Sequence, residues 1–341
     1  SEIKGSLMSD NILYSIRNMT VEYKTRAGIV RAVDDVSLDI QRGEILGLVG
    51  ESGCGKSTFG KALMRLHDGP ARIAAGELWF DGRDLMTLPI DQMPDIRGAE
   101  IGMVFQDPMT SLNPVQSIMK HLTETICAHE PQTSEEAAKE RANELVEKLG
   151  IRHERLKEYP HQMSGGMRQR VMIALALALR AKLVIADEPT TSLDVIVEAK
   201  FLDLLKELQQ EFGLTILLIT HNIGVVAEIC DRVAVMYAAK MAEVGTAEDV
   251  FANPKHPYTQ GLLKSVPNIK TDKEELYKMN GEPPNLLTPP SGCRYHPRCP
   301  FAMDICKQEE PPLKDVNNGQ LSSCWLYSKE GKGKKLEAQH G

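Results

Sequence analysis

The first part of the chain alternates apolar and polar residues in short runs, which is the pattern of half-buried β-strands. Such runs cover 16–23 and 29–40, and a more continuously apolar strand follows at 44–49. After a glycine-rich stretch, the spacing predicts a helix over 56–66. The N-terminal region is therefore expected to be antiparallel and to lead into a buried core strand.

Helical periodicity then dominates the middle of the chain. The segment 115–159 is expected to be entirely helical, with Ser134 and the glutamates after it opening a charged amphipathic helix. Apolar strands return at 183–186 and 215–220, on either side of a helix over 197–212. Strands that alternate with helices indicate an α/β fold with a mostly parallel, covered sheet.

Two shorter strand signals and the C-terminal part complete this outline. A strand, an Asp81-Gly82 turn and a second strand are expected over 76–84, and a short apolar strand over 102–106. After residue 251, frequent prolines break any long element and predict a loop-rich extension. We expect a main domain over 8–250 with a helical subdomain at about 107–170, an extension over 251–330 and a solvated tail over 331–341.

Composition and charge exclude several classes of protein. The chain has 341 residues, 42% of them hydrophobic, and a net charge of -7, so it can bury a core but has no field that attracts nucleic acid. Its best apolar run, 171–179, ends at Arg180 and is shorter than the ~18 residues that cross a bilayer. The N-terminus shows no secretory signal, so the expected compartment is the cytosol.

Residues 50–58 match the phosphate-binding loop G-x-x-x-x-G-K-[ST], between a predicted strand and a predicted helix. Glycines let backbone N–H groups surround phosphates, Lys56 can reach the β and γ phosphates, and the Ser57 hydroxyl can ligate Mg²⁺. A chance glycine-rich turn would lack these flanks. The residues expected to contact ATP are Ser52, Gly53, Cys54, Gly55, Lys56, Ser57 and Thr58.

A buried strand at 183–186 ends in two carboxylates, Asp187 and Glu188. Downstream of a phosphate loop, this arrangement predicts that Asp187 holds Mg²⁺ and that Glu188 orients or deprotonates the attacking water. An acidic pair at a strand end is common by itself, and only the phosphate loop upstream makes it a specific signal of a nucleotide site.

The heptapeptide Met-Ser-Gly-Gly-Met-Arg-Gln at 163–169 precedes a predicted helix and resembles the L-S-G-G-Q signature of ATP-binding cassettes. Alone, it would be read as a helix N-cap with two glycines. Together with the other motifs, it makes nearly all of residues 11–265 resemble the ABC transporter ATPases. The resemblance implies an ABC-type nucleotide-binding domain that works as a sandwich dimer. In such a dimer Ser164, Gly165 and Gly166 of one subunit cap the γ phosphate held by Lys56 of the other.

The same resemblance assigns further roles. Tyr23 stands where the family stacks an aromatic ring on adenine, Gln106 where a glutamine senses Mg²⁺ and touches the membrane subunits, and His221 where a histidine contacts the γ phosphate. Ser192-Leu193-Asp194 resembles the D-loop, so Asp194 is also a candidate nucleotide-site residue. On local chemistry alone, Tyr23 could be a core tyrosine and His221 a capping or core histidine.

The chain departs from the family pattern at a few positions: Met163 and Met167 in the signature, Ser192 in the D-loop and Asn222 after the histidine. None of these changes removes a catalytic group. Because Lys56, Gln106, Asp187, Glu188 and His221 remain, the resemblance implies a site that hydrolyses ATP.

Two segments narrow the resemblance to the dipeptide/oligopeptide importer ATPases: 167–174 after the signature, and Asn-Pro-Lys-His-Pro-Tyr-Thr at 253–259. This implies a second ABC ATPase subunit, identical or homologous, two transmembrane permeases and, indirectly, an extracytoplasmic substrate-binding protein. The expected location is the cytoplasmic face of the membrane. The family also includes importers of nickel, glutathione and oligosaccharides, so the resemblance does not determine which molecule is transported.

Two other classes of ABC protein are alternatives. A soluble protein acting on ribosomes or DNA would usually carry two cassettes or long coiled-coil insertions, and neither is present here. The His-Pro-Tyr segment and the cysteine-rich extension argue against an exporter ATPase, and this argument rests only on their resemblance to the importer family.

The extension carries four cysteines, Cys293, Cys299, Cys306 and Cys324, with the spacing C-x₅-C-x₆-C-x₁₇-C. We expect them to bind one [4Fe–4S] cluster, partly because the family's extension also carries four cysteines. Zinc is the alternative, although structural zinc sites normally use ligand pairs two to four residues apart, and such a pair is missing. The remaining alternative is that the four thiols are unrelated and bind no metal.

Overall fold

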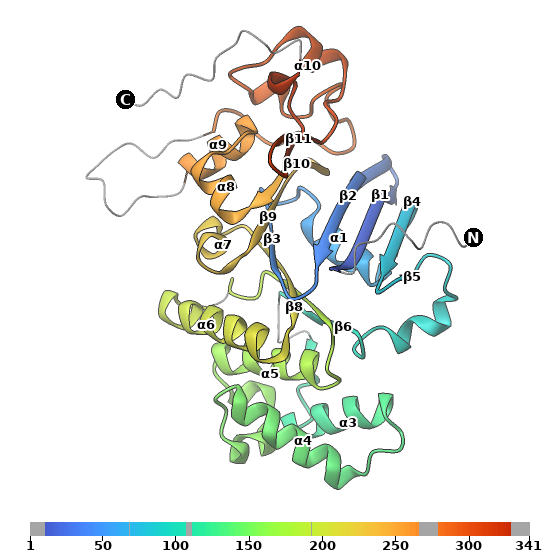
Figure 1. Cartoon of the computed structure of the whole chain (residues 1–341). Coiled ribbons are helices and arrows are strands. Elements are labelled where there is room, and N and C mark those ends of the chain that lie inside the picture. Colours follow the sequence, from blue (N-terminus) through green and yellow to red (C-terminus); the bar gives the residue numbers. More distant parts are fainter. Residues whose placement is uncertain (1–10, 68, 107–110, 192, 266–278, 329–341) are drawn as a thin grey trace.

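Two β-sheets form the framework of the protein (Figure 1), which we describe from a computed structural model. The described residues are 11–67, 69–106, 111–191, 193–265 and 279–328. The following predicted features lie outside them: the tail over 331–341, the start of the main domain at 8–10, the start of the helical subdomain at 107–110, and Ser192 of the D-loop.

The smaller sheet is antiparallel and has the strand order β2-β1-β4-β5. Its strands are β1 (Ile12–Thr25), β2 (Gly28–Gln41), β4 (Ala71–Phe80) and β5 (Arg83–Asp84). Asp81 (φ 48°) and Gly82 (φ 77°) make the turn between β4 and β5, both in the left-handed region that a tight hairpin needs. The predicted antiparallel start and the predicted turn are both confirmed.

The larger sheet has the order β11-β12-β10-β9-β3-β8-β7-β6. Its strands are β3 (Ile45–Val49), β6 (Ile101–Val104), β7 (Leu183–Asp187), β8 (Thr215–Thr220), β9 (Arg232–Tyr237), β10 (Lys240–Thr246), β11 (Lys314–Asn317) and β12 (Gln320–Ser322). The five strands from β9 to β6 pair in parallel, and the other three add antiparallel pairs at one edge. The predicted parallel, covered sheet is thus confirmed.

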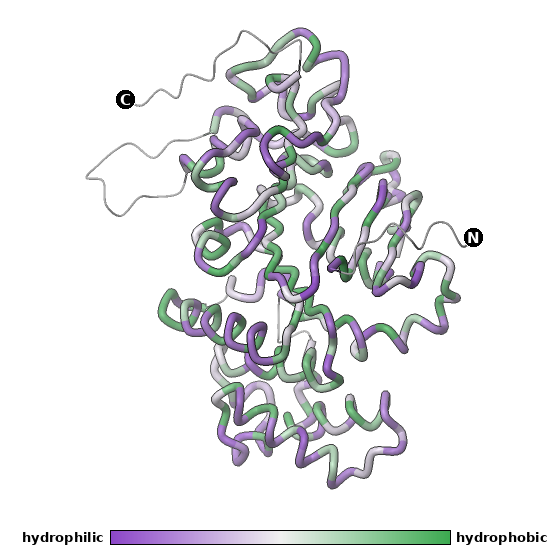
Figure 2. Tube along the Cα trace, viewed as in Figure 1, coloured by the Kyte–Doolittle hydropathy of each residue, from purple (hydrophilic) through white to green (hydrophobic). Residues whose placement is uncertain are grey.

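Every residue of β3 is buried because both faces of the sheet are covered. Ile45 and Val49 face a core shared with the helices, whereas Leu46 and Leu48 face a core shared with the antiparallel sheet and α1 (Lys56–Leu63). This period of two, with apolar side chains on both faces, makes the strand a continuous hydrophobic run. Figure 2 shows the resulting hydrophobic band along the central strands.

The other helices are α3 (Ile118–His129), α4 (Glu135–Lys148), α5 (Gly165–Leu177), α6 (Val195–Phe212), α7 (Ile223–Ile229), α8 (Ala247–Ala252), α9 (Pro257–Lys264) and α10 (Asp304–Gln308). Ser134 caps α4, since its Oγ accepts from the N–H of Ala137 at 3.2 Å. The predicted opening of the charged helix is therefore confirmed. Among helices of the described chain, none is both long and apolar enough to cross a membrane.

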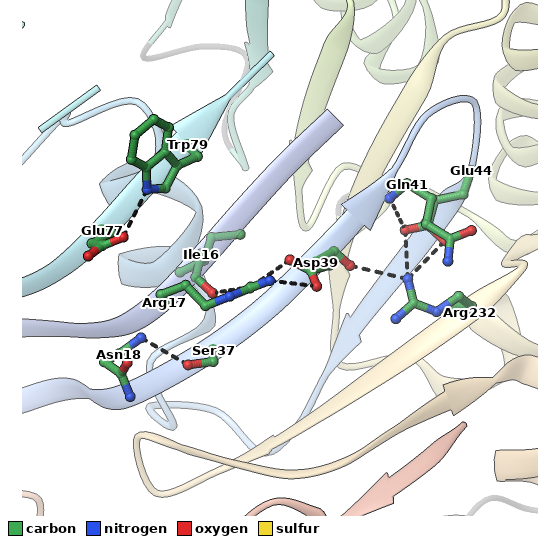
Figure 3. Close-up of polar contacts among 10 residues, drawn as sticks. All are labelled: Ile16, Arg17, Asn18, Ser37, Asp39, Gln41, Glu44, Glu77, Trp79 and Arg232. Carbon is green, nitrogen blue, oxygen red and sulfur yellow. Dashed lines mark hydrogen bonds and ion pairs between the residues drawn. The ribbon is translucent and has the colours of Figure 1, made fainter. Parts of the chain in front are cut away.

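Arg232 at the start of β9 helps to join the two sheets (Figure 3). Its Nη1 donates to the carbonyl oxygen of Asp39 on β2, at 3.2 Å, and to Oε1 of Glu44, at 3.0 Å. The Asp39 carboxylate in turn pairs with Arg17 on β1. The Arg232 side chain thus links the large sheet to β2 of the small sheet, and the Arg17–Asp39 pair links β2 to β1 within the small sheet.

The extension is built into the large sheet at its edge. Strand β12 pairs with β10 and with β11, so residues far along the chain continue the central sheet. Figure 1 shows α10 and its neighbours at the end of the molecule opposite to α3 and α4. The sequence had predicted loops here, and neither β11 nor β12 was anticipated.

Candidate functional site

The phosphate loop connects β3 to α1, as its motif predicts. Gly50, Gly53 and Gly55 all have positive φ angles, which favour glycine. At Gly55 (φ 110°) a Cβ would also lie 1.9 Å from the carbonyl oxygen of Ala32, so no other residue fits. Ser52 is exposed, like Gly53 beside it, and a ligand can therefore reach the loop's outer rim.

The N-terminus of α1 offers a second set of donors. Gly55 is its N-cap and has no side chain to accept the first-turn N–H groups. These groups, with the helix dipole behind them, favour an anion at this position. The Lys56 ammonium is buried and donates to the carbonyl oxygens of Gly50, at 2.8 Å, and Glu51, at 3.1 Å. Cys54 is buried at the same loop, and burial raises the pKa of its thiol.

Ser57 and Asp187 come together between α1 and the end of β7. The Ser57 hydroxyl donates to Oδ1 of Asp187 at 2.9 Å. Burial raises the pKa of the Asp187 carboxyl, and the hydrogen bond from Ser57 partly offsets this effect. A hydroxyl and a carboxylate beside a phosphate loop are oxygen ligands of the type that Mg²⁺ uses, so these residues fit the predicted ion.

Glu188 is the centre of a polar cluster. Gln106 Nε2 donates to its Oε2 at 3.1 Å, and the Thr191 hydroxyl donates to the same oxygen at 3.1 Å. His221 Nδ1 lies 3.3 Å from Oε1. The structure therefore brings three predicted residues, Gln106, Glu188 and His221, to one point at the carboxyl ends of the parallel strands.

Thr191 is the member of this cluster that sequence reasoning missed. It follows the acidic pair by three positions, in Asp-Glu-Pro-Thr-Thr at 187–191. A hydroxyl three residues after a carboxylate can reach back to it in a turn, which was the available signal. Its hydrogen bond helps to hold the Glu188 carboxylate in the observed orientation.

Tyr23 and Thr58 meet at the edge of the loop. The Tyr23 hydroxyl lies 3.1 Å from Oγ1 of Thr58, and the tyrosine is half-buried. This places an aromatic side chain from β1 beside the first turn of α1. Stacking on adenine stays a prediction.

The signature residues form a separate surface. Ser164 caps α5, Asp194 caps α6 by accepting from the N–H of Val197 at 2.9 Å, and both line one pocket with Gly165 and Gly166. Among the described residues lining this pocket, none belongs to the phosphate loop. Within one chain the two predicted halves of the ATP site are therefore not assembled.

Cys293, Cys299, Cys306 and Cys324 all line a single small cavity in the extension. Burial raises the pKa of Cys293 to about 11, and burial with the neighbouring thiols raises the pKa of Cys324 to about 12. None of the seven cysteines, all within the described residues, forms a disulfide. No group of three or more His, Cys, Asp or Glu in the described ranges is arranged to hold a metal ion, so the predicted metal centre has no direct support.

Comparison with known families gives two matches. Residues 33–191 match the family described as ABC transporter, and residues 242–306 match the oligopeptide/dipeptide transporter C-terminal region. The second match begins within β10 and includes three of the four extension cysteines.

Individual relatives agree with both matches. The chain is 46% identical to the oligopeptide transport ATP-binding protein OppD of Bacillus subtilis, over 92% of this chain and 88% of that protein. It is 45% identical to the dipeptide transport ATP-binding protein DppD of the same organism, over 92% and 94% of the two chains. Among solved structures, a dimeric post-hydrolysis state of an ATP-binding cassette bound to ADP and phosphate has 30% identity and a TM-score of 0.63. That match covers 69% of this chain and 98% of the other.

Proposed function

Because the chain belongs to the ABC transporter ATPases and carries the oligopeptide/dipeptide transporter C-terminal region, we propose that it is the ATP-hydrolysing subunit of a di- or oligopeptide importer. The observation that carries the ATP-hydrolysing part of this proposal is the cluster around Glu188; the family match of the C-terminal region supports the peptide-import part. Its carboxylate is held by Gln106, Thr191 and His221, directly after the Asp187 that bonds Ser57 of the phosphate loop.

Hydrolysis at this site is chiefly positioning and charge stabilisation. Ser57 and Asp187, which are hydrogen-bonded to each other, would hold Mg²⁺, and the ion would supply charge neutralisation of the phosphates. Lys56 turns from the loop carbonyls to the phosphate oxygens. Glu188 accepts a proton from a water as the water oxygen bonds to the γ phosphorus, and the bond to the leaving ADP oxygen breaks. His221, whose Nδ1 lies 3.3 Å from Glu188, would contact the γ phosphate.

We propose that a complete site needs two cassettes. Ser164, Gly165 and Gly166 are exposed or half-buried and lie away from their own phosphate loop. Val195 and Ile196, next to Asp194, are 80% and 70% exposed, an apolar surface suited to a partner. A second ABC ATPase, identical or homologous, would supply the missing half of each site.

The remaining partners follow from the relatives' described roles in oligopeptide and dipeptide transport. Two transmembrane permeases would dock on the cassette pair, at the cytoplasmic face of the membrane. An extracytoplasmic binding protein would deliver the peptide to them. Gln106 would link the nucleotide site to the permeases.

The experiment is uptake by proteoliposomes that contain the chain, its partner cassette and its permeases, supplied with the binding protein. ATP inside the vesicles should drive accumulation of a labelled dipeptide or tetrapeptide. Accumulation of nickel, glutathione or an oligosaccharide instead would reassign the cargo within the family. ATP hydrolysis with no uptake of any of these would contradict the importer assignment.

We also propose that the four extension cysteines hold a [4Fe–4S] cluster. What supports this is their convergence on one cavity from three segments of the chain. A cluster is a larger body than one ion, so its thiolates stand further apart than the ligands of a single tetrahedral zinc. When bound, it would supply folding energy to a part of the chain with few regular elements.

Metal analysis of anaerobically purified protein tests the cluster. The protein should be brown and contain about four irons per chain. Cys306→Ser should lose the iron, whereas Cys127→Ser, at a cysteine in α3 outside the set, should keep it. Colourless protein with one zinc per chain, or with no metal, would contradict the proposal.

A further inference from the structure

Glu51, the second residue of the phosphate loop, is held at all three of its polar groups. Its N–H donates to the Tyr258 hydroxyl at 2.9 Å, and its carbonyl oxygen accepts from Lys56 at 3.1 Å. Its carboxylate accepts two parallel bonds from Arg298, at 2.8 and 3.0 Å. Two of these three partners, Tyr258 and Arg298, come from the extension, between β10 and β11.

Arg298 is itself firmly seated. Its side chain is only 6% exposed, its Nε donates to the carbonyl oxygen of Asn280 at 2.9 Å, and its Nη1 also donates to the Tyr237 hydroxyl at 3.2 Å. The guanidinium carbon lies 5.7 Å from the ring centre of Tyr237 and 5.9 Å from that of Tyr295. A planar guanidinium that makes four hydrogen bonds and has aromatic rings beside it is held in one orientation.

The same aromatic rings connect Arg298 to the cysteine cavity. Tyr237, Tyr258 and Tyr295 pack against one another with ring centres 4.5 to 5.5 Å apart. Tyr295 also lines the cavity of the four cysteines, and Arg298 immediately precedes Cys299. A constraint on the backbone between Tyr295 and Cys299 therefore also constrains the position of Arg298.

The charge of Glu51 gives this contact a consequence for binding. A phosphate loop must accept a polyanion, and a free carboxylate within it repels phosphates. The Glu51 side chain is 20% exposed, so water and salt screen its charge incompletely. The bidentate pair with Arg298 neutralises that charge and also turns the carboxylate toward the extension.

We propose that Arg298 is a positioning residue through which the cysteine-rich extension sets the affinity of the phosphate loop for nucleotide. The proposal deepens the ATPase assignment and rests on it. Arg298 acts through Glu51: it neutralises the one acidic side chain of the loop and fixes the loop's second residue.

Calorimetric titration of the full-length chain with MgATP tests the proposal. Arg298→Met should raise the Kd for MgATP about tenfold, because the Glu51 carboxylate is then unpaired. Glu51→Gln in the same background should restore the Kd to within about threefold of the parent value, because the repelling charge is gone. Such restoration is a coupling that a purely structural arginine would not show.

Arg294→Met provides the matched control. Arg294 also reaches from the extension to the main domain, where it donates to the Ala238 carbonyl oxygen and pairs with Asp34 rather than with the acidic residue of the phosphate loop. Its substitution should change the Kd by less than about twofold, and a thermal melt of each variant should show that it is folded.

Two results would overturn the proposal: an unchanged Kd for folded Arg298→Met, or a raised Kd that Glu51→Gln does not restore. A parent chain that binds no MgATP would overturn both this proposal and the ATPase assignment, whereas parent binding with unaltered variants would overturn this proposal alone.

Discussion

Glu188 shows how much of the site depends on the conformation of one residue. Its φ of 47° lies in the left-handed region, which is unfavourable for a residue with a Cβ by about 1 kcal/mol or more. Its N–H bonds to the carbonyl oxygen of Ile219 at 2.8 Å, and this contact helps to hold the turn. The turn directs the carboxylate to Gln106, Thr191 and His221. The strain is thus located at the group proposed to activate water.

Asp81 gives a prediction about pH at the scale of a single residue. Hydrogen bonds from Lys182 and Arg42 lower the pKa of its carboxyl to about 2. A carboxyl with a lowered folded-state pKa contributes stability above its unfolded pKa of about 3.9, and this contribution disappears as the pH falls towards 2. Asp81→Asn should therefore lower the free energy of unfolding at pH 7 by about 1 kcal/mol, since the partners are partly exposed.

Urea unfolding of parent and variant between pH 7 and pH 3 measures this effect. Asparagine tolerates the left-handed backbone of position 81, so the substitution removes the charge without new strain. The difference in unfolding free energy should be constant above pH 5 and shrink towards pH 3. A difference that stays the same over the whole range would show that the ion pairs are not its cause.

At the scale of elements, the extension contains a β-hairpin, β11 and β12, that was not predicted from the sequence although its turn carries a recognisable signal. Asn318 (φ 44°) and Gly319 (φ 94°) join β11 to β12, and Asn-Gly is a strong hairpin signal. The flanking strands have only four and three residues, and β11 is largely exposed, so no alternation marks them. Their stability comes from pairing with β10 across the sheet edge.

Other elements followed directly from local pattern. The phosphate loop and its flanks were predictable because the motif specifies a strand, glycines with positive φ and a helix in a fixed order. Asp187 and Glu188 were predictable because a buried apolar strand delivers them to the same sheet edge. The pair Glu51 and Arg298 was not, because 247 residues separate them and only tertiary packing brings them together.

At the scale of the whole molecule, one chain presents two separate surfaces, each an incomplete part of the proposed ATP site. The phosphate loop and the Glu188 cluster form one, and the signature residues Ser164 to Gly166 form the other, on a separate pocket. The extension adds strands to the sheet and contacts the phosphate loop through Tyr258 and Arg298. The proposed motor is therefore a pair of cassettes, each with its loop supported from the C-terminal side.

The most direct measurement of the central claim is phosphate release from MgATP by the assembled cassette pair, with bound nucleotide measured in parallel. The parent should turn over, and Glu188→Gln should bind MgATP with a similar Kd while releasing phosphate at least about a hundredfold more slowly, because it cannot accept the water's proton. Lys56→Ala should instead weaken nucleotide binding. If Glu188→Gln releases phosphate at the parent's rate, Glu188 is not the group that activates water, and the mechanism derived from its cluster is wrong.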